Sequence, residues 1–379
     1  MAVSVRCIGT DEYNLAVECL NRNWSAGHIL ARDKKLFDWT FLRSDLWDRD
    51  GYSFAVAEDN GRPIGQLGGV PFEFNRFGKT GMGVSTANWS IEPKARTGST
   101  GLQLLFEFQR PPFDLVMLFG MGAKIRPLME ALKYQSISQI PRFLMILSDG
   151  ERKFRRLIET TYPEWSKIRI DDLISTFQPP NQTEFPVKFD AKIPDNWDGS
   201  TWRRLAEQTV GAARNFRYLK WRYLDHPSYD YQFVHVEEKS GHGLAIWRSE
   251  DIRLEDGEED STFLGNFGRI VEFLAPSSEC AASLAMALKI DLETQGAFAA
   301  DFWGYNGPSG SALRNAGFRL TQSHADGRRI PTRFQPIDIE MIDIYSAVLG
   351  QNKAPTPEFS ASCPWLWTKG DADMDRPKQ

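Results

Sequence analysis

Residues 96–101 have the composition and the position of an anion-binding site. They read Arg-Thr-Gly-Ser-Thr-Gly and lie between an extended run, 82–91, and an apolar helical run that begins at Leu102. A small-residue turn before a helix leaves backbone N–H groups without partners, and the helix dipole adds positive potential there. Glycine also lets the backbone approach a phosphate closely. We therefore predict a phosphate-binding loop formed by Arg96, Thr97, Gly98, Ser99, Thr100 and Gly101.

Composition is that of an ordinary globular protein and excludes several classes. The chain has 379 residues, 41% hydrophobic and 25% charged, with a net charge of −5. This acidic balance argues against nucleic-acid binding through a basic field. The four cysteines are scattered without a CxxC pair, so we expect no metal and no disulfide framework. No run approaches the ~20 apolar residues of a membrane span and the N-terminus has no signal-like region, so we expect a cytoplasmic protein.

Similar short segments recur at a nearly constant distance along the chain. Trp39 lies in Phe-Asp-Trp-Thr-Phe-Leu, and Trp221 lies in Leu-Lys-Trp-Arg-Tyr-Leu. Three further pairs of segments keep the same order, at offsets of 179 to 184 residues. A repeat this long indicates a duplicated domain rather than a solenoid. We predict a first domain over residues 1–177, a linker over 178–190, a second domain over 191–350 and a C-terminal tail over 351–379.

Each copy is predicted to contain helices, a hairpin, a longer strand, and then alternating helices and strands. The first hairpin turns at Asp59-Asn60-Gly61-Arg62, a strong turn signal. The longer strand covers residues 82–91 in the first copy and 269–274 in the second, and a helix follows each. This order predicts an α/β fold with a mixed sheet in two tandem domains. We expect the two sheets to pack side by side.

The order of elements, with the loop after the fourth strand, resembles the GNAT superfamily of acyl-CoA N-acyltransferases. The family's loop reads Gln/Arg-x-x-Gly-x-Gly/Ala; Arg96 and Gly101 match its ends, while Ser99 replaces the central glycine. The resemblance implies that the loop holds the pyrophosphate of coenzyme A, with acetyl-CoA or another acyl-CoA as co-substrate. Ile91-Glu92-Pro93 resembles the family's strand end, so Ile91 joins the predicted cofactor site.

The chain departs from the family at the helix that often carries a tyrosine general acid. Met129 holds that position in the first copy, and Leu313 holds it in the second. The second copy also lacks a phosphate loop, because Ser-Ser-Glu-Cys at 277–280 contains no glycine. We therefore expect one acyl-CoA per chain, in the first domain, with the acceptor site shaped by the second.

Over nearly its full length the chain resembles tandem GNAT-like proteins encoded with bacterial cell-surface polysaccharide genes. Its C-terminal residues 367–377, Trp-Thr-Lys-Gly-Asp-Ala-Asp-Met-Asp-Arg-Pro, resemble their terminal motif. The resemblance implies an N-acyltransferase, and more specifically an N-acetyltransferase. Its implied partner is a small-molecule amine, such as a nucleotide- or lipid-linked amino sugar. Two alternatives stay open: a Fem-type aminoacyltransferase, which shares the duplicated fold, and a non-catalytic binding or scaffold protein.

Amine acylation needs a neutral amine, a polarised carbonyl and a protonated leaving thiolate. Asn88 lies mid-strand, beside the thioester in the fold that the resemblance implies, and is a candidate to bind the acceptor or orient a water. Glu272, within an apolar strand, and Glu92, at a strand end, are the candidate bases. A buried carboxylate at 272 needs a partner or a raised pKa. Gly120-Met121-Gly122 is expected to bulge and open the sheet to the cofactor.

The second copy supplies the predicted acceptor-binding residues, Trp303, Tyr305 and Asn306, because an aromatic face beside hydrogen-bonding groups suits a sugar. A free histidine titrates near neutrality, but a His-Pro at a helix end is more often a C-terminal cap, so we expect His226 to cap the helix rather than to act in catalysis. The aspartates at 371, 373 and 375 have a spacing that suggests calcium but lack the Gly and Glu of an EF-hand loop, so we expect the tail to fold over the acceptor cleft instead.

Overall fold

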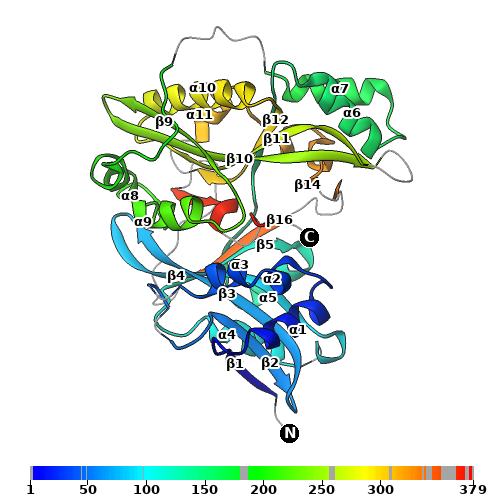
Figure 1. The fold of residues 1–379 in the computed structure, drawn as a ribbon, viewed down its shortest axis with the longest axis vertical. Coiled ribbons are helices and arrows are strands. Elements are labelled where there is room, and N and C mark those ends of the chain that lie inside the picture. Colours follow the sequence, from blue (N-terminus) through cyan, green and yellow to red (C-terminus); the bar gives the residue numbers. More distant parts are fainter. Residues whose placement is uncertain are drawn as a thin grey trace.

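The computed structural model describes residues 3–43, 45–47, 49–96, 98–179, 187–255, 261–306, 310–334, 337–338, 344–350, 364–371 and 375–377. Within them, one mixed sheet of 15 strands runs through both halves of an elongated molecule (Figure 1). The predicted α/β class with a mixed sheet is confirmed.

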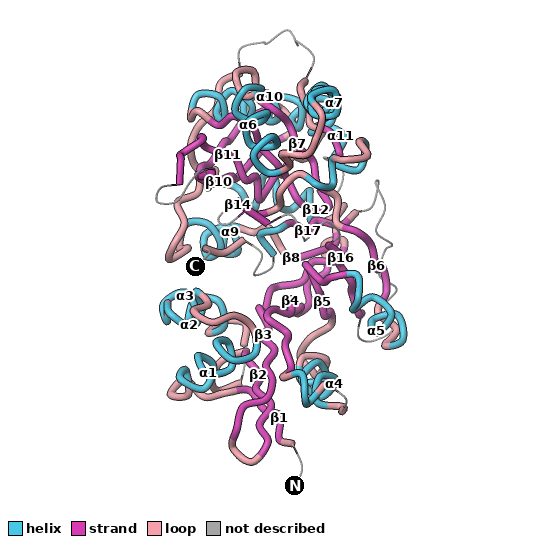
Figure 2. Tube along the Cα trace, turned by 90° about the vertical axis from the view of Figure 1, so that its right-hand side faces the viewer, coloured by secondary structure: helices cyan, strands magenta, loops and turns pink. Residues whose placement is uncertain are grey.

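The first half lies at the N-terminal end of the molecule. Helices α1 to α3 pack on one side of its strands and α4 packs on the other (Figure 2). The predicted hairpin is confirmed, since Asp59 pairs with Arg62 and the turn residues Asn60 and Gly61 have φ angles of 54° and 76°. The elements are β1 (Ser4–Cys7), α1 (Tyr13–Asn23), α2 (Ile29–Arg32), α3 (Lys34–Phe41), β2 (Phe54–Asp59), β3 (Arg62–Arg76), β4 (Lys79–Ile91), α4 (Thr100–Glu107), β5 (Leu115–Gly122), α5 (Arg126–Ala131), β6 (Gln135–Gln139), β7 (Arg142–Ile146), α6 (Glu151–Thr161) and α7 (Lys167–Phe177).

The second half repeats the pairing plan of the first. Three antiparallel strands, β9 to β11, are followed by β12, which is parallel to β11, just as β5 is parallel to β4. The long helix α10 packs on one face of these strands. The elements are α8 (Arg203–Ala206), β8 (Val210–Ala212), α9 (Phe216–Leu219), η4 (Lys220–Leu224), β9 (Gln232–Glu238), β10 (Gly241–Glu255), β11 (Ser261–Leu274), α10 (Ser278–Thr294), β12 (Ala297–Asn306), α11 (Gly310–Asn315), β13 (Arg319–Leu320), β14 (Arg333–Phe334), β15 (Ile337–Asp338), β16 (Ile344–Gly350), β17 (Trp365–Thr368) and η8 (Lys369–Asp371).

The two halves exchange strands. β7 comes from the first half of the sequence but pairs with β12 and β13, and β16 comes from the second half but pairs with β5 and β6. Helices α6 and α7 follow β7 and pack with Ile252, Leu254 and Phe267 of the second half. Residues 142–177 therefore lie with the second half in space, although the predicted first domain extends to residue 177. The domain bounds stay a prediction.

The halves are joined edge to edge, as predicted, by the sheet order β3-β8-β17-β12. A shared core forms around this join: Met117 and Phe119 of the first half lie in one buried cluster with Tyr223, Trp365 and Trp367. The C-terminal strand β17 is thus an internal strand of the sheet, paired with β8 on one side and β12 on the other.

The two tryptophans that mark the sequence repeat lie against each other at this join. The rings of Trp39 and Trp221 stack at 4.9 Å with 20° between their planes. Each indole N–H donates to the other residue's carbonyl oxygen, at 3.1 Å from Trp39 and 3.4 Å from Trp221. Such reciprocal bonds need both rings in place, so the pair fixes how α3 sits on η4.

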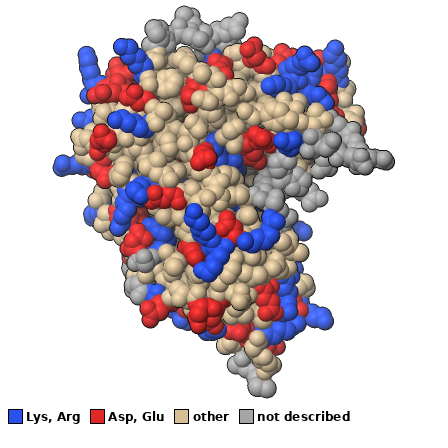
Figure 3. Space-filling view, in the orientation of Figure 1, with Lys and Arg blue, Asp and Glu red and all other residues tan. Residues whose placement is uncertain are grey.

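The surface carries no extended single-sign patch on the face seen in Figure 3, where Lys and Arg are interspersed with Asp and Glu. No described helix combines the length and the apolar character that crossing a bilayer requires.

We expect Trp39→Ala to lower the free energy of unfolding by about 3 kcal/mol, because it removes a stacked ring and both reciprocal bonds. Chemical denaturation measures this. Trp24→Ala is the control: that ring is 45% exposed, and its loss should cost about 0.5 kcal/mol or less. Equal losses in the two variants would contradict a structural role for the pair.

Candidate functional site

Strands β4 and β5 pair over a short distance and then part. Their parallel contacts run only from Gly83–Leu115 to Thr86–Leu118. β4 continues to Ile91 and β5 to Gly122 with no contact between them in the ladder. Both strands therefore turn unpaired backbone edges toward the opening, which is the kind of place where a ligand with amide groups binds.

Irregular residues on both strands produce this opening. On β4, Asn88 and Trp89 together oppose Leu67 alone, which is a β-bulge, and Asn88 has a φ angle of 55°. On β5, the predicted bulge at residues 120–122 is confirmed: the register against β16 skips Gly120, whose φ angle is 98°. Asparagine adopts this left-handed conformation more readily than most residues that carry a side chain, so residue type and bulge agree at Asn88.

Buried polar atoms without partners gather at the bulge. The amide nitrogen and oxygen of Asn88 are both buried and make no hydrogen bond within the described part of the chain, and neither does Nε1 of Trp89. Asn88 is only 3% exposed. An unsatisfied buried polar group costs about 1–3 kcal/mol, so three such atoms at one point indicate a place where a ligand or ordered water completes the bonding.

The predicted phosphate loop lies next to the bulge. A Cβ placed on Gly101 would lie 3.5 Å from Cζ2 of Trp89, so the start of α4 adjoins the unpartnered indole. The side chain of Ser99 does not cap α4, which leaves the first-turn N–H groups available. Arg96 is exposed and donates Nε–H to the carbonyl oxygen of Ile91 at 2.9 Å. Gly98 is exposed, Thr100 is buried at the first turn, and Thr97 lies outside the described residues.

The second half has the same opening, but its own chain fills it. β11 and β12 are parallel only as far as Ile270–Phe302, and a bulge follows at Val271. Beyond that point β12 pairs instead with β17, from Gly304–Thr368 to Asn306–Leu366. The tail is thus inserted into the sheet. The side chain of Ser277 caps the start of α10, since it accepts from the N–H of Cys280.

Glu272, a predicted base, is fully buried and paired. Arg214 Nε lies 2.8 Å from its Oε1, and the Tyr223 hydroxyl donates to the same oxygen at 2.7 Å. Its Oε2 has no partner among the described residues. Burial raises the pKa of Glu272 to about 7, and the nearby charge of Asp371 raises it as well, against the opposing effect of Arg214. The sequence-based requirement for a partner or a raised pKa is met on both counts.

A hollow lies between the halves; we call it the interface hollow. It has about 500 Å³ of empty space, which includes some open solvent. Apolar and aromatic side chains of α2, α3 and β3 form one wall, and η4 with the C-terminal segment forms the other. Its lining residues are Leu30, Leu36, Trp39, Thr40, Val70, Phe72, Tyr218, Trp221, Arg222, Gly370, Asp371, Asp375 and Arg376.

The other predicted site residues lie away from this hollow. Trp303 donates to Asp301 at 2.9 Å and borders a second, smaller hollow of about 270 Å³. The Tyr305 hydroxyl donates to the Gln139 carbonyl oxygen at 3.2 Å. The Asn306 side chain lies outside the described part. Glu92 sits at the end of β4 in an ion pair of 2.5 Å with Arg62, the arrangement of an ordinary surface carboxylate.

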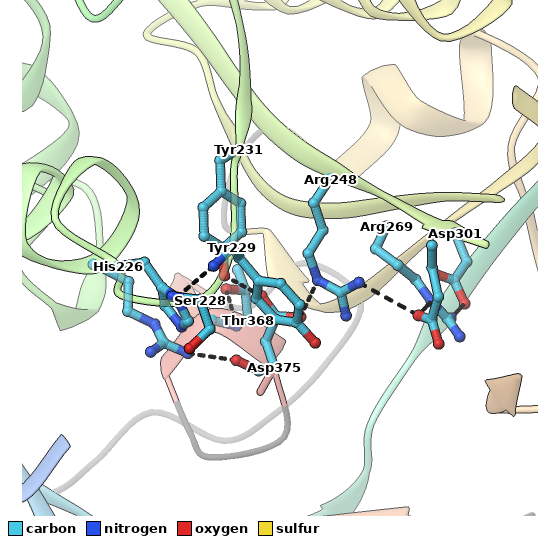
Figure 4. A network of polar contacts seen from close by, with 12 residues as sticks. His226, Ser228, Tyr229, Tyr231, Arg248, Arg269, Asp301, Thr368 and Asp375 are labelled. Atoms are coloured by element: carbon cyan, nitrogen blue, oxygen red, sulfur yellow. Dashed lines mark hydrogen bonds and ion pairs between the residues drawn. The ribbon is translucent and has the colours of Figure 1, made fainter. Parts of the chain in front are cut away.

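Sequence reasoning missed a chain of buried ion pairs that holds the tail (Figure 4). Arg248 donates to Asp375 at 2.8 Å, and the Tyr231 hydroxyl donates to the same carboxylate at 2.7 Å. On its other side, Arg248 lies 3.5 Å from Glu250. Glu250 also forms an ion pair with Arg269, and Arg269 forms one with Asp301. The only sequence signal was the row of aspartates, whose spacing suggested calcium rather than pairing with arginines. Asp373 lies outside the described residues.

The structure does not support the alternative interpretation of His226 as a group that titrates near neutrality. Its Nδ1 accepts from the N–H groups of Ser228 and Tyr229, both at 3.1 Å. Burial and the charge of Arg222 lower its pKa to about 3. The ring is therefore a neutral element of the aromatic packing beside Trp39.

Comparison with solved structures identifies the fold. No family model matches the sequence, and a search of curated proteins finds no match. The chain is similar to a GCN5-related N-acetyltransferase from Anabaena variabilis ATCC 29413, at TM-score 0.55 and 11% identity over 91% of this chain and 72% of that one. It is similar to a conserved protein of unknown function from Enterococcus faecalis V583, at TM-score 0.52 and 11% identity, over 84% of this chain and 70% of that one. It is also similar to Saccharomyces cerevisiae N-myristoyltransferase with bound myristoyl-CoA, at TM-score 0.52 and 10% identity, over 92% of this chain and 80% of that one. These likenesses show that the protein has the fold of the GCN5-related N-acetyltransferases.

We expect Asn88→Gly to leave the free energy of unfolding unchanged or to raise it by about 1 kcal/mol, because it removes unpartnered atoms and relieves a positive φ. Asn75→Ala is the matched control from the neighbouring strand. The Asn75 amide donates to two buried carbonyl oxygens, at 3.0 and 2.8 Å, so this change should lower stability by about 2 kcal/mol. An equal loss in both variants, measured by denaturant melts, would make Asn88 a structural residue.

Proposed function

We propose that this protein is an acyl-CoA-dependent N-acyltransferase with a single cofactor site, in its first half. The observation that carries the proposal is the coincidence of three features at one place: the parted strands β4 and β5, the unpartnered atoms of Asn88 and Trp89, and the uncapped start of α4. Each of these features leaves polar groups without partners, which is unfavourable in a domain that binds no ligand. Together they match a long ligand with a phosphate at one end and amides along its length.

The residues present fit an acyl-CoA. The N–H groups at residues 99–102 and the helix dipole would hold the pyrophosphate. The open edges of β4 and β5 would pair with the amides of the pantetheine arm, as a strand pairs with a sheet edge. Backbone N–H groups at the bulge would polarise the thioester carbonyl, and Asn88 would orient the acceptor or a water. The thioester itself supplies the activated acyl group.

The proposed acceptor is an amine bound in the interface hollow. The hollow joins aromatic surfaces, including Trp39 and Trp221, to charged groups on its tail side. An amino sugar has this combination, because one face of the ring is apolar and its rim is polar. The aminoacyl-transferring alternative differs in its donor, and it would not require a pyrophosphate site at α4. Coenzyme A binding therefore separates the two.

We expect Gly101→Glu to weaken coenzyme A binding by at least ~10-fold, about 1.4 kcal/mol, because it adds a negative charge beside the N–H donors. Isothermal titration calorimetry measures this. Gly101→Ala is the matched control, since a Cβ there meets its neighbours at an ordinary 3.5 Å or more and should leave affinity nearly unchanged. If the glutamate variant kept wild-type affinity, the phosphate loop and the assignment built on it would be wrong.

A further inference from the structure

Two buried carboxylates share one guanidinium group beside the interface hollow. Arg214 donates through Nη1 to Asp371 Oδ1 at 2.8 Å and through Nη2 to Oδ2 at 2.5 Å. Its Nε lies 2.8 Å from Glu272 Oε1. All three side chains are at most 1% exposed. Among the described residues, no second Lys or Arg forms an ion pair with either carboxylate. We call these three residues the shared-arginine cluster.

The charges of the cluster do not balance when both carboxylates are ionised. Two negative groups and one positive group leave one uncompensated buried charge, which is costly in a low-dielectric interior. Binding one proton removes this cost, so the cluster is built to exchange a single proton. The groups that face it are the hydroxyls of Tyr218, on Asp371, and Tyr223, on Glu272, with Arg222 near both tyrosines.

Hydrogen bonds indicate where that proton resides. Asp371 accepts four: two from Arg214, one from the Tyr218 hydroxyl at 2.7 Å and one from the N–H of Thr368 at 2.8 Å. These four bonds occupy both oxygens of Asp371. Glu272 keeps one oxygen without a partner, and burial raises its pKa to about 7. The proton therefore resides on Glu272 below neutrality and is released above it.

The C-terminal segment that carries Asp371 contacts both the hollow and the unpaired part of β5. Asp371 and Tyr218 line the interface hollow. In β17, just before Asp371, the ring of Trp367 lies 5.4 Å from that of Phe119. Phe119 is the first residue of β5 beyond its last contact with β4. The C-terminal segment thus brings a proton-exchanging group close to the place where the acyl group is proposed to lie.

We propose that the shared-arginine cluster binds the amino group of the acceptor and takes its proton; this rests on the proposed function. The hydroxyl oxygen of Tyr218, a residue that lines the hollow, accepts from the ammonium group, because the hydroxyl proton is already donated to Asp371. Asp371, Arg214 and Glu272 are positioning residues that set the cluster's charge. An N–H bond of the ammonium breaks and its proton passes to the Tyr218 hydroxyl oxygen, while the hydroxyl proton of Tyr218 moves along its hydrogen bond to Asp371 Oδ1. The freed lone pair forms the N–C bond while the C–S electrons leave with the thiolate. The nitrogen's second proton ends on the thiol, and the cluster returns its proton to solvent.

Infrared difference spectroscopy of the full-length protein across pH tests the cluster directly. The wild type should show the C=O stretch of a protonated carboxylic acid that disappears as pH rises through neutrality, and Glu272→Gln should lack it. Asp371→Asn removes the neighbouring negative charge, so Glu272 should ionise at a pH lower by about one unit. Asp375→Asn is the matched control: the pKa of Asp375 is lowered to about 2, and its loss weakens the same tail without removing the band.

Binding of the amine is tested on the same samples with ethanolamine and, as its uncharged match, ethylene glycol. Ethanolamine should lower the pH at which half of the band is lost, because a nearby cation favours the ionised carboxyl. Ethylene glycol should leave that pH unchanged. No titrating band, or a midpoint indifferent to ethanolamine, would overturn the proposal. Calorimetry with coenzyme A distinguishes failure of the proposed function from failure of the cluster's role. If coenzyme A does not bind, the proposed function is refuted. If coenzyme A binds but the carboxylic-acid band does not titrate, only the cluster's role is refuted.

Discussion

The parting of two parallel strands is the constraint on which the rest of this structure depends. In both halves a bulge ends the parallel contact after a few residues, at Asn88 and Trp89 in β4 and at Val271 in β11. A parted pair leaves backbone groups that need partners. The second half meets this need with its own C-terminal strand, β17. The first half has no such strand within the described residues, so its opening remains for a ligand.

Insertion of the tail explains why so many charges are buried near the join. An internal strand that is followed by Asp371 and Asp375 brings carboxylates into the core, where each needs a cation. Arg214 and Arg248 supply them, and both arginines are almost completely buried. Gly370 is fitted to the same place, because a Cβ there would collide with the Tyr223 hydroxyl. Breaking one partner of such a pair is costly, so the tail is a fixed part of the fold rather than a removable cover.

Features encoded by adjacent residues were predictable from the sequence. The Asn60-Gly61 turn, the bulge at Gly120 and the helix after the loop all follow from local residue types. Trp39 and Trp221, on which the predicted repeat was based, stack on each other at the join between the halves. Glu272 was recognisable because a carboxylate among apolar strand residues needs a special environment.

Features that depend on distant partners were not predictable. Asp371 and Arg214 are 157 residues apart, and nothing in the local sequence links them. The exchange of β7 and β16 places each strand in the half of the sheet that the other half of the sequence forms. Trp303 and Tyr305 looked like exposed sugar-binding groups, yet both are largely buried and bonded to internal partners. In each case the long-range topology decides where the side chain lies.

The most direct test of the central claim, that only the first opening takes a ligand, is a crystal structure of the protein with acetyl-CoA. We expect one molecule per chain, with its pyrophosphate at the start of α4, its thioester beside Asn88, and β17 still paired with β12. A cofactor bound in the second half, in place of β17, would contradict the account, as would one bound outside the opening between β4 and β5.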